Sequence, residues 1–154
     1  MYKRIMVALD QSFMAQPVLA AAIDLAKATQ ANLALCYAVD EAIFAQREVA
    51  MMLPNSVGKA EARLRLGAQS FLERQAEVVR AAGVDVELRV IESEKLSVAD
   101  MLLEAARDWR ADLLVLGSHG QRGIERFFVG STAERLVRKA DISLLLVRDE
   151  DETT

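Results

Sequence analysis

The sequence predicts one α/β domain in which parallel strands alternate with helices. The chain has 154 residues, of which 53% are hydrophobic and 27% charged, and this is the size and composition of an ordinary globular domain. Short apolar runs, typical of strands buried on both faces, recur along it. Longer segments with apolar residues at helical spacing separate these runs. Strict alternation of the two implies right-handed crossovers and a parallel sheet covered by helices on both faces.

Five apolar runs are expected to form the strands of the sheet. The first is followed by Asp10-Gln11-Ser12, a polar stretch that ends the strand. The five expected strands span residues 5–9, 33–39, 84–91, 112–116 and 143–147. Each is short and buried in character, so a sheet without a solvent-facing side is expected.

Four helices are expected between the strands. The first, at about residues 14–29, is apolar almost all round, as expected for a helix buried against a sheet. The second is predicted by the spacing of Leu64, Ala68, Phe71, Leu72, Val79 and Ala82. The third is predicted by the spacing of Val98, Met101, Leu102, Ala105, Ala106 and Trp109. The last and shortest is predicted by Ala133, Leu136, Val137 and Ala140.

One connection, residues 40–57, is long for a link between a strand and a helix. It contains Met51-Met52-Leu53-Pro54 and has no clear period. Two interpretations remain open: a loop whose apolar residues pack on the domain, or a mobile lid or partner-docking segment. Elsewhere no linker or repeat interrupts the pattern, so residues 1–148 are expected to form one domain and residues 149–154 a short acidic tail.

The composition excludes several classes of function. With a net charge of −4, the chain lacks the overall positive charge that is typical of proteins that bind nucleic acid. A single cysteine, Cys36, cannot build a disulfide framework, and we expect it to be a small buried apolar residue. The first apolar run is too short for a signal peptide, and no run approaches the length of a membrane span. We therefore expect a soluble cytoplasmic protein with no nucleic-acid or membrane partner.

The most informative segment follows the fourth expected strand, because open α/β sheets bind ligands beyond the carboxyl ends of their strands. Four of the seven glycines lie in its sixteen residues, 117–132. Glycine lets the backbone approach a phosphate closely or adopt a positive φ. Gly130-Ser131-Thr132 begins the expected last helix and offers free N–H groups at the positive end of the helix dipole. Ser131 is also a candidate N-cap, and the two roles are compatible.

Local charge supports an anionic ligand at this segment. Residues 117–139 contain five basic and two acidic side chains, a local charge of +3: Arg122, Arg126, Arg135, Arg138 and Lys139 against Glu125 and Glu134. A solvated helix face would give the same count, so no single arginine is assigned. Neither G-x-x-x-x-G-K-S/T nor a G-x-G-x-x-G after a strand is present. Glycines, a helix start and positive charge together favour an anionic ligand.

These residues carry a resemblance to a known family. Over residues 2–148 the chain resembles the ATP-binding branch of the universal stress protein family. The similar segments are Ile5-Met6-Val7-Ala8-Leu9-Asp10-Gln11-Ser12, Tyr37-Ala38-Val39-Asp40 and residues 111–120. The family's nucleotide pattern, G-x2-G-x9-G-S/T, is matched by Gly117, Gly120 and Gly130-Ser131. The position of this match, after the fourth expected strand, makes it specific.

The resemblance implies a Rossmann-like fold of the adenine nucleotide alpha hydrolase type, with strand order 3-2-1-4-5. It implies that the crevice between the first and fourth strands binds ATP, or ADP or AMP, together with Mg²⁺. By resemblance, Ala8 lies beside the adenine, the backbone of Ala38 recognises the adenine edge, and Asp10 lies near the ribose. The implied phosphate and ribose cradle is Leu116, Gly117, Ser118, His119, Gly120, Gln121, Arg122, Gly123, Gly130, Ser131 and Thr132.

Several residues have alternative interpretations. Asp10 is also a candidate cap for the turn after the first strand. His119 has no orienting partner that the sequence identifies, so no catalytic residue is assigned. Trp109 is expected to be part of the core. The chain departs from the family at Gln11, where a glycine is common, and at Glu92-Ser93-Glu94-Lys95-Leu96, where a glycine-containing turn is common.

The resemblance implies a regulatory protein of the stress response. ATP is expected to be a ligand rather than a substrate, because the groups offered to its phosphates stabilise the ground state and the transition state alike. Family members pair their last strand across a two-fold axis, so a homodimer through Ser143–Val147 is implied, with an unknown regulatory protein as further partner. The competing hypothesis is a slow ATPase or a nucleotidyl-transfer enzyme, but no cluster of carboxylates accompanies the cradle. A third hypothesis is a dimeric interaction module that binds AMP or no nucleotide.

Overall fold

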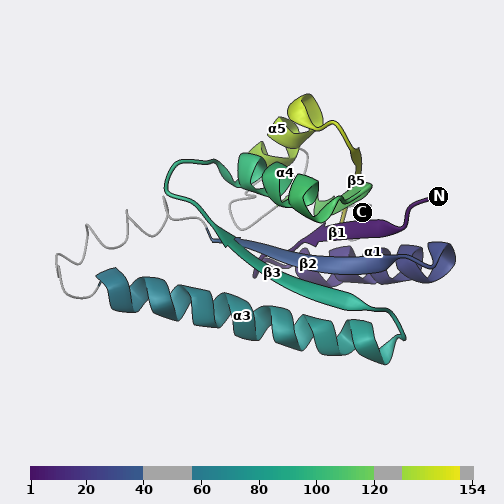
Figure 1. Ribbon diagram of the computed structural model, residues 1–154, viewed down its shortest axis with the longest axis horizontal. Coiled ribbons are helices and arrows are strands. Elements are labelled where there is room, and N and C mark those ends of the chain that lie inside the picture. The colour runs from purple at the N-terminus through teal and green to yellow at the C-terminus, as the bar shows by residue number, and fades with distance from the viewer. Residues whose placement is uncertain (40–56, 120–129, 150–154) are drawn as a thin grey trace.

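A five-stranded parallel sheet lies at the centre of the computed structural model, which describes residues 1–39, 57–119 and 130–149 (Figure 1). The strand order is β3-β2-β1-β4-β5, and every neighbouring pair is parallel. The strands are β1 (Arg4–Ala8), β2 (Asn32–Val39), β3 (Val86–Glu92), β4 (Leu113–Gly117) and β5 (Ser143–Val147). The predicted fold and strand order are therefore confirmed. The predicted third strand began at residue 84, two residues too early, because Gly83 with a φ of +81° turns the chain there.

Helices cover both faces of this sheet. One core joins the first face of β1 and β2 to α1 (Ala15–Thr29) and α3 (Val57–Ala81). A second core joins the opposite face to α4 (Val98–Trp109) and α5 (Ser131–Lys139). The central strand β1 contributes to both cores, with Ile5 and Val7 in the first and Met6 in the second. Continuous apolar runs and alternating helices were sufficient to predict this layering.

The amino-terminal part of α3 departs from the predicted apolar stripe. Leu64 was expected to be buried, but it is 40% exposed. The buried face of the helix starts at Ala68 and includes a glutamine that the periodicity did not select, Gln75. The cause is geometric: α3 extends beyond the carboxyl end of β3, so its first turns have no sheet to cover (Figure 1). Val137 of α5, also expected in a stripe, is 58% exposed.

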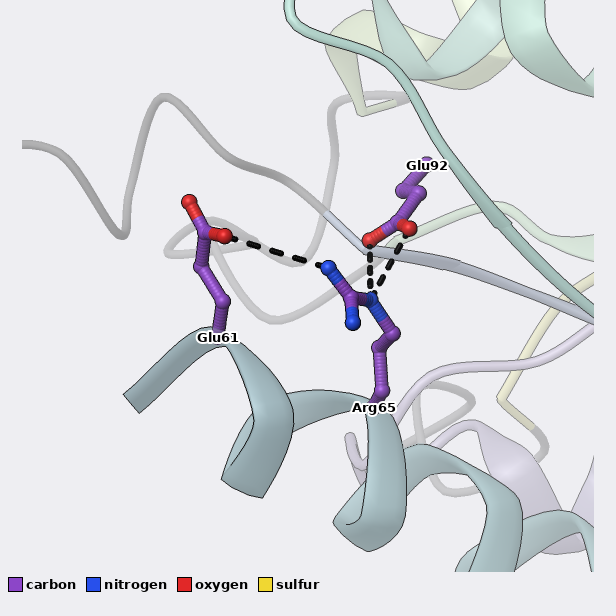
Figure 2. Close-up of polar contacts among 3 residues, drawn as sticks. All are labelled: Glu61, Arg65 and Glu92. Atoms are coloured by element: carbon purple, nitrogen blue, oxygen red, sulfur yellow. Dashed lines mark hydrogen bonds and ion pairs between the residues drawn. The ribbon is translucent and has the colours of Figure 1, made fainter. Parts of the chain in front are cut away.

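A carboxylate contact holds this projecting part of α3 to the sheet. Arg65 Nε donates to both carboxylate oxygens of Glu92, at the end of β3, over 2.9 and 2.8 Å. Glu61, one turn before Arg65, lies 3.8 Å from its guanidinium (Figure 2). Both side chains of the Arg65–Glu92 pair are partly exposed, so the pair orients the helix more than it stabilises the fold.

The amino end of the sheet is closed by a polar network around Asp112. Its carboxylate accepts hydrogen bonds from the backbone N–H groups of Lys3 (2.8 Å) and Arg4 (3.1 Å). Arg4 Nε donates to the carbonyl of Trp109 (2.8 Å), and the Arg4 guanidinium lies 4.0 Å from the centre of the Trp109 ring. Trp109 itself is 3% exposed, which confirms its predicted place in the core. The network ties β1 to the chain that enters β4.

Candidate functional site

The candidate site lies at the carboxyl end of the sheet, where the direction of the strand order reverses. The central β1 has β2 on one side and β4 on the other, so the chain leaves it in one direction and later returns on the other side. Ala8 pairs with Cys36, which places Ala38 just beyond the end of β1, and Val7 pairs with Val115 of β4. In open α/β sheets ligands bind at such a reversal. Ala8 and Ala38 are half-buried, and Leu116 is buried.

The turn after β1 is built around Asp10. Its carboxylate accepts a hydrogen bond from the N–H of Ser12 (2.9 Å), and the Ser12 hydroxyl accepts one from the N–H of Met14 (3.2 Å). Asp10 therefore takes the turn-capping role that the sequence left open. A carboxylate accepts several hydrogen bonds, and this one is half-buried, so the turn role is compatible with contact to a ribose.

Gly117 lies in close contact with the protein's own atoms. A Cβ at this position would lie 3.0 Å from the Cβ of Met14 and 3.0 Å from the carbonyl oxygen of His119. The residue does not adopt a positive φ. The sequence interpretation assigned this glycine to the approach of a phosphate, but a closer reason is the contact with Met14. That contact brings the turn after β1 against the end of β4.

Ser118 joins the end of β4 to two other elements. Its N–H donates to the carbonyl of Val147 in β5 (2.9 Å), and its carbonyl accepts from the N–H of Gly130 (2.7 Å). The Ser118 hydroxyl lies 3.0 Å from Nδ1 of His119, which is the orienting partner that the sequence did not identify. Both side chains are buried, and Nε2 of His119 has no hydrogen-bond partner within the described part of the chain.

The amino terminus of α5 faces the end of β4 because of the contact between Gly130 and Ser118. The N-cap is Gly130, and no described side chain caps the helix, so the proposed capping role of Ser131 is wrong by one residue. The first bond of the helix runs from the N–H of Glu134 to the carbonyl of Gly130 (2.9 Å). N–H groups of a first helical turn lack acceptors within the helix. Ser131 is exposed and Thr132 half-buried, so this end of the helix is accessible.

Part of the positive charge expected at the site lies elsewhere. Arg138 and Lys139 are in the last turn of α5, at the opposite end from Gly130. Arg138 pairs with Glu134 (2.9 Å), and Lys139 pairs with Asp100 of α4 (3.2 Å). Hydrogen bonds from Lys139 and Ser97 hold the pKa of Asp100 below its usual value. Backbone donors, rather than these two cations, are therefore available to an anion.

The remaining members of the predicted cradle, Gly120, Gln121, Arg122 and Gly123, lie outside the described residues. So do Glu125, Arg126 and nearly all of the connection at 40–57. Within the described ranges, no group of three or more His, Cys, Asp or Glu is arranged to hold a metal ion. No helix among the described residues is long and apolar enough to cross a membrane.

Sequence reasoning missed Tyr37 as a neighbour of the site. Its ring packs edge-on against Phe71 of α3, with 5.8 Å between ring centres. Burial raises the pKa of Tyr37, and the negative charge of nearby Asp10 raises it further. The signal in the sequence was the segment Tyr37-Ala38-Val39-Asp40, one of those that carry the resemblance. Cys36, on the opposite face, is fully buried, and burial raises its pKa to about 12, as expected for an inert thiol.

A comparison with known families identifies the fold. The model of the universal stress protein family matches residues 1–148. The chain belongs to this family. It is 33% identical over 153 residues to a Staphylococcus aureus (strain USA300) protein that carries the universal stress protein name, covering 97% of this chain and 86% of that protein.

Solved structures of family members are similar over nearly the whole chain. A member from Burkholderia pseudomallei is 30% identical with a TM-score of 0.75, over 96% of this chain and 97% of that one. A universal stress protein in complex with cAMP is 24% identical with a TM-score of 0.66, over 96% and 97% of the two chains. One from Archaeoglobus fulgidus in complex with dAMP is 19% identical with a TM-score of 0.59, over 96% and 98%. At these identities the last two show the shared fold alone.

Proposed function

We propose that this chain is a regulatory protein of the stress response that binds ATP, or ADP or AMP, at the carboxyl end of its sheet. The observation that carries the proposal is the accessible amino terminus of α5, which the bond between Gly130 and Ser118 holds beside the end of β4. First-turn N–H groups and the helix dipole favour a phosphate there. Family members that bind cAMP and dAMP support an adenine nucleotide.

The roles of the individual residues follow from their places around this edge. Ala8 and Ala38, at the ends of β1 and β2, are proposed to contact the adenine. Asp10 is proposed to accept a hydrogen bond from the ribose, since hydroxyl groups need such acceptors. Gly117, Gly130, Ser131 and Thr132 are proposed to surround the phosphates together with the predicted cradle residues around them.

Mg²⁺ is proposed to enter with the nucleotide. Since the described residues contain no group arranged for a metal ion, the phosphate oxygens would be its main ligands, which Mg²⁺ accepts readily. The ion would neutralise phosphate charge and so add to the effect of the backbone donors. The residues present thus fit a nucleotide that carries its own cation.

The nucleotide is proposed to be a ligand rather than a substrate. Backbone N–H groups stabilise phosphate charge in the ground state and in the transition state alike, which gives binding without much acceleration. The Ser118–His119 pair has the contact of a nucleophile with a base, yet Ser118 is only 1% exposed and His119 only 6%. Such burial keeps the Ser118 hydroxyl from acting as a nucleophile on the phosphates, although the backbone there can still contribute to the cradle. The output would be a conformation of the bound protein that a regulatory partner recognises in the cytoplasm.

A homodimer through β5 is part of this proposal. β5 lies at the end of the strand order and pairs with β4 on one side. Leu145 in β5 is 37% exposed, and an apolar edge strand favours aggregation unless another strand covers it. A second copy would cover it with one self-complementary surface. We expect light scattering to give the mass of a dimer at micromolar concentration and Leu145→Pro to abolish the dimer; a stable wild-type monomer would contradict this.

Calorimetric titration of the purified protein with ATP, ADP and AMP in the presence of Mg²⁺ tests the binding site. Gly130 has φ −61° and ψ 158°, which valine adopts readily, so Gly130→Val should fold. Its side chain would occupy the approach of the phosphate, and we expect ATP affinity to fall by at least about 100-fold, a loss of about 2.7 kcal/mol. Gly67→Val is the matched control, because a Cβ at Gly67 meets nothing within 4 Å and lies on α3, away from the site. If Gly130→Val is folded and its ATP affinity is unchanged, the proposed phosphate-binding role of Gly130 and its neighbours is wrong.

A further inference from the structure

The two edges of the sheet differ in their charge. β5 has the sequence Ser-Leu-Leu-Leu-Val, without a charged side chain, whereas β3 begins with Val-Glu-Leu-Arg-Val. These five residues of β3 are symmetrical about Leu88: a valine lies two residues away on either side, and the direct neighbours are Glu87 and Arg89, which carry opposite charges. β3 pairs with β2 and with no other described strand. Its sequence is therefore complementary to a second, antiparallel copy of itself.

The backbone of β3 supports such pairing at its outer edge. The N–H of Leu33 in β2 donates to the carbonyl of Asp85 (2.9 Å). Since alternate residues of a strand bond to the same neighbour, the backbone groups of Arg89 are directed to β2, like this carbonyl, and those of Leu88 are directed away from it. The N–H and carbonyl groups of residues 86, 88 and 90 are therefore the ones that an added strand would meet.

Arg89 has a polar atom that the described part of the chain leaves unsatisfied. Its Nε is buried without a hydrogen-bond partner among the described residues, while the side chain as a whole is 34% exposed. The carboxylate of Glu87 in the same copy lies 4.0 Å from the guanidinium and accepts a hydrogen bond from Trp109 Nε1 (3.0 Å). A buried donor without an acceptor costs free energy, so a further carboxylate beside this guanidinium would be favoured.

We propose that the outer edge of β3 is an interface at which a second copy of this chain pairs antiparallel, with a two-fold axis at Leu88. In this register the two Leu88 residues face each other, and Glu87 lies directly opposite Arg89 of the second copy on both sides of the axis. Residues 86, 88 and 90 form the hydrogen-bonded pairs, so the charged residues fall in the intervening pairs, whose side chains are closer. Opposite charges in such positions stabilise an antiparallel pair, and like charges destabilise it.

The charges select this register and separate the interface from the rest of the account. An axis at Val86 would place Asp85 opposite Glu87 of the second copy, and an axis at Val90 would place an isoleucine opposite Arg89. The interface does not rest on nucleotide binding. It also differs from the proposed dimer through β5, which lies at the opposite edge of the sheet. With both edges paired, the sheet would continue from one dimer to the next.

Charge reversal tests the register. Sedimentation velocity over a concentration series should show wild-type association beyond the β5 dimer, with a dissociation constant on the order of 100 µM, as for a small interface. Glu87→Arg and Arg89→Glu should each weaken this step about 10-fold or more, since each places like charges opposite one another. An equimolar mixture of the two variants should regain the wild-type strength, because every opposing pair between unlike copies then has opposite charges.

Arg80→Glu is the matched control, because it changes the net charge as Arg89→Glu does but lies on the exposed surface of α3. Circular dichroism establishes that each variant is folded, and calorimetric titration should give each the ATP affinity of the wild type. In the wild type, ¹⁵N nuclear magnetic resonance should show concentration-dependent shifts at the amides of Leu88 and Val90. These shifts test the interface without any substitution.

Each outcome decides the inference. Absence of association beyond the β5 dimer at millimolar concentration would overturn it and leave the proposed function standing. Association that the two β3 variants do not weaken, that Arg80→Glu weakens equally, or that the mixture does not regain would also overturn it. A wild type that passes from monomer to dimer in the charge-dependent way described would contradict the β5 dimer and support pairing through β3.

Discussion

The two ends of the sheet are built from different contacts. At the amino end, the carboxylate of Asp112 accepts from two backbone N–H groups and Arg4 binds both the carbonyl and the ring of Trp109. At the carboxyl end, the carboxylate of Asp10 accepts a hydrogen bond from the N–H of Ser12 in the same turn. The amino terminus of α5 has no described side-chain cap. The first end satisfies its polar groups with other parts of the chain. At the second end, no described side chain caps α5, and the carboxylate of Asp10 is half-buried.

This difference separates stability from binding. Bonds that join distant parts of the chain, such as Asp112 with Lys3, stabilise the folded state because they exist only in it. Donors without an internal acceptor contribute little to folding and are available to a ligand. The comparison therefore predicts that substitutions at the amino end change unfolding, whereas substitutions at the carboxyl end change nucleotide affinity. One substitution at each end tests this prediction.

The larger effect is expected from Asp10→Ala at the carboxyl end. Loss of a charged acceptor costs about 1.5–3 kcal/mol of binding, which weakens ATP affinity roughly 10- to 150-fold. The accompanying loss of the bond to Ser12 should destabilise the fold only slightly, since it caps an accessible turn. Calorimetric titration measures the affinity, and Asp24→Ala on the exposed face of α1 is the control. An unchanged dissociation constant would leave Asp10 as a turn residue only.

A somewhat smaller effect, in stability alone, is expected from Asp112→Ala at the amino end. The change leaves the N–H groups of Lys3 and Arg4 without their acceptor and should lower the free energy of unfolding by about 1–3 kcal/mol. ATP affinity of the folded variant should remain within about twofold, because this end of the sheet has no proposed ligand contact. Urea unfolding measures the change, with Asp108→Ala, exposed on α4, as control. Weaker ATP binding by folded Asp112→Ala would contradict the prediction that the amino end contributes to stability alone.

Much of the fold could be predicted from the chain because its strands are buried on both faces. Continuous apolar runs such as those around Val7 and Leu114 locate β1 and β4 with little ambiguity. The order of the strands came from the family resemblance, since periodicity does not show which strands are neighbours. Leu64 misled the prediction because helical spacing continues past the end of the sheet, where nothing covers it.

The candidate site was predictable in its position and less so in its contacts. Sequence patterns located the glycines and the start of α5, but the cap fell on Gly130 rather than on Ser131. The close packing at Gly117 involves Met14, more than a hundred residues earlier, and the ring that packs against Tyr37 comes from Phe71 of α3. Contacts between residues so far apart depend on the register of the sheet, which a single sequence does not display.

The central claim is that an adenine nucleotide binds at the carboxyl end of the sheet and not at the amino end. Nuclear magnetic resonance of the ¹⁵N-labelled chain, titrated with ATP and Mg²⁺, observes the backbone amides of both ends at once. The account predicts saturating shifts concentrated at Asp10, Gly117 and the first turn of α5, with the amides of Lys3, Arg4 and Asp112 unmoved. Absence of shifts at millimolar ATP, or shifts centred on the amino end, would contradict it.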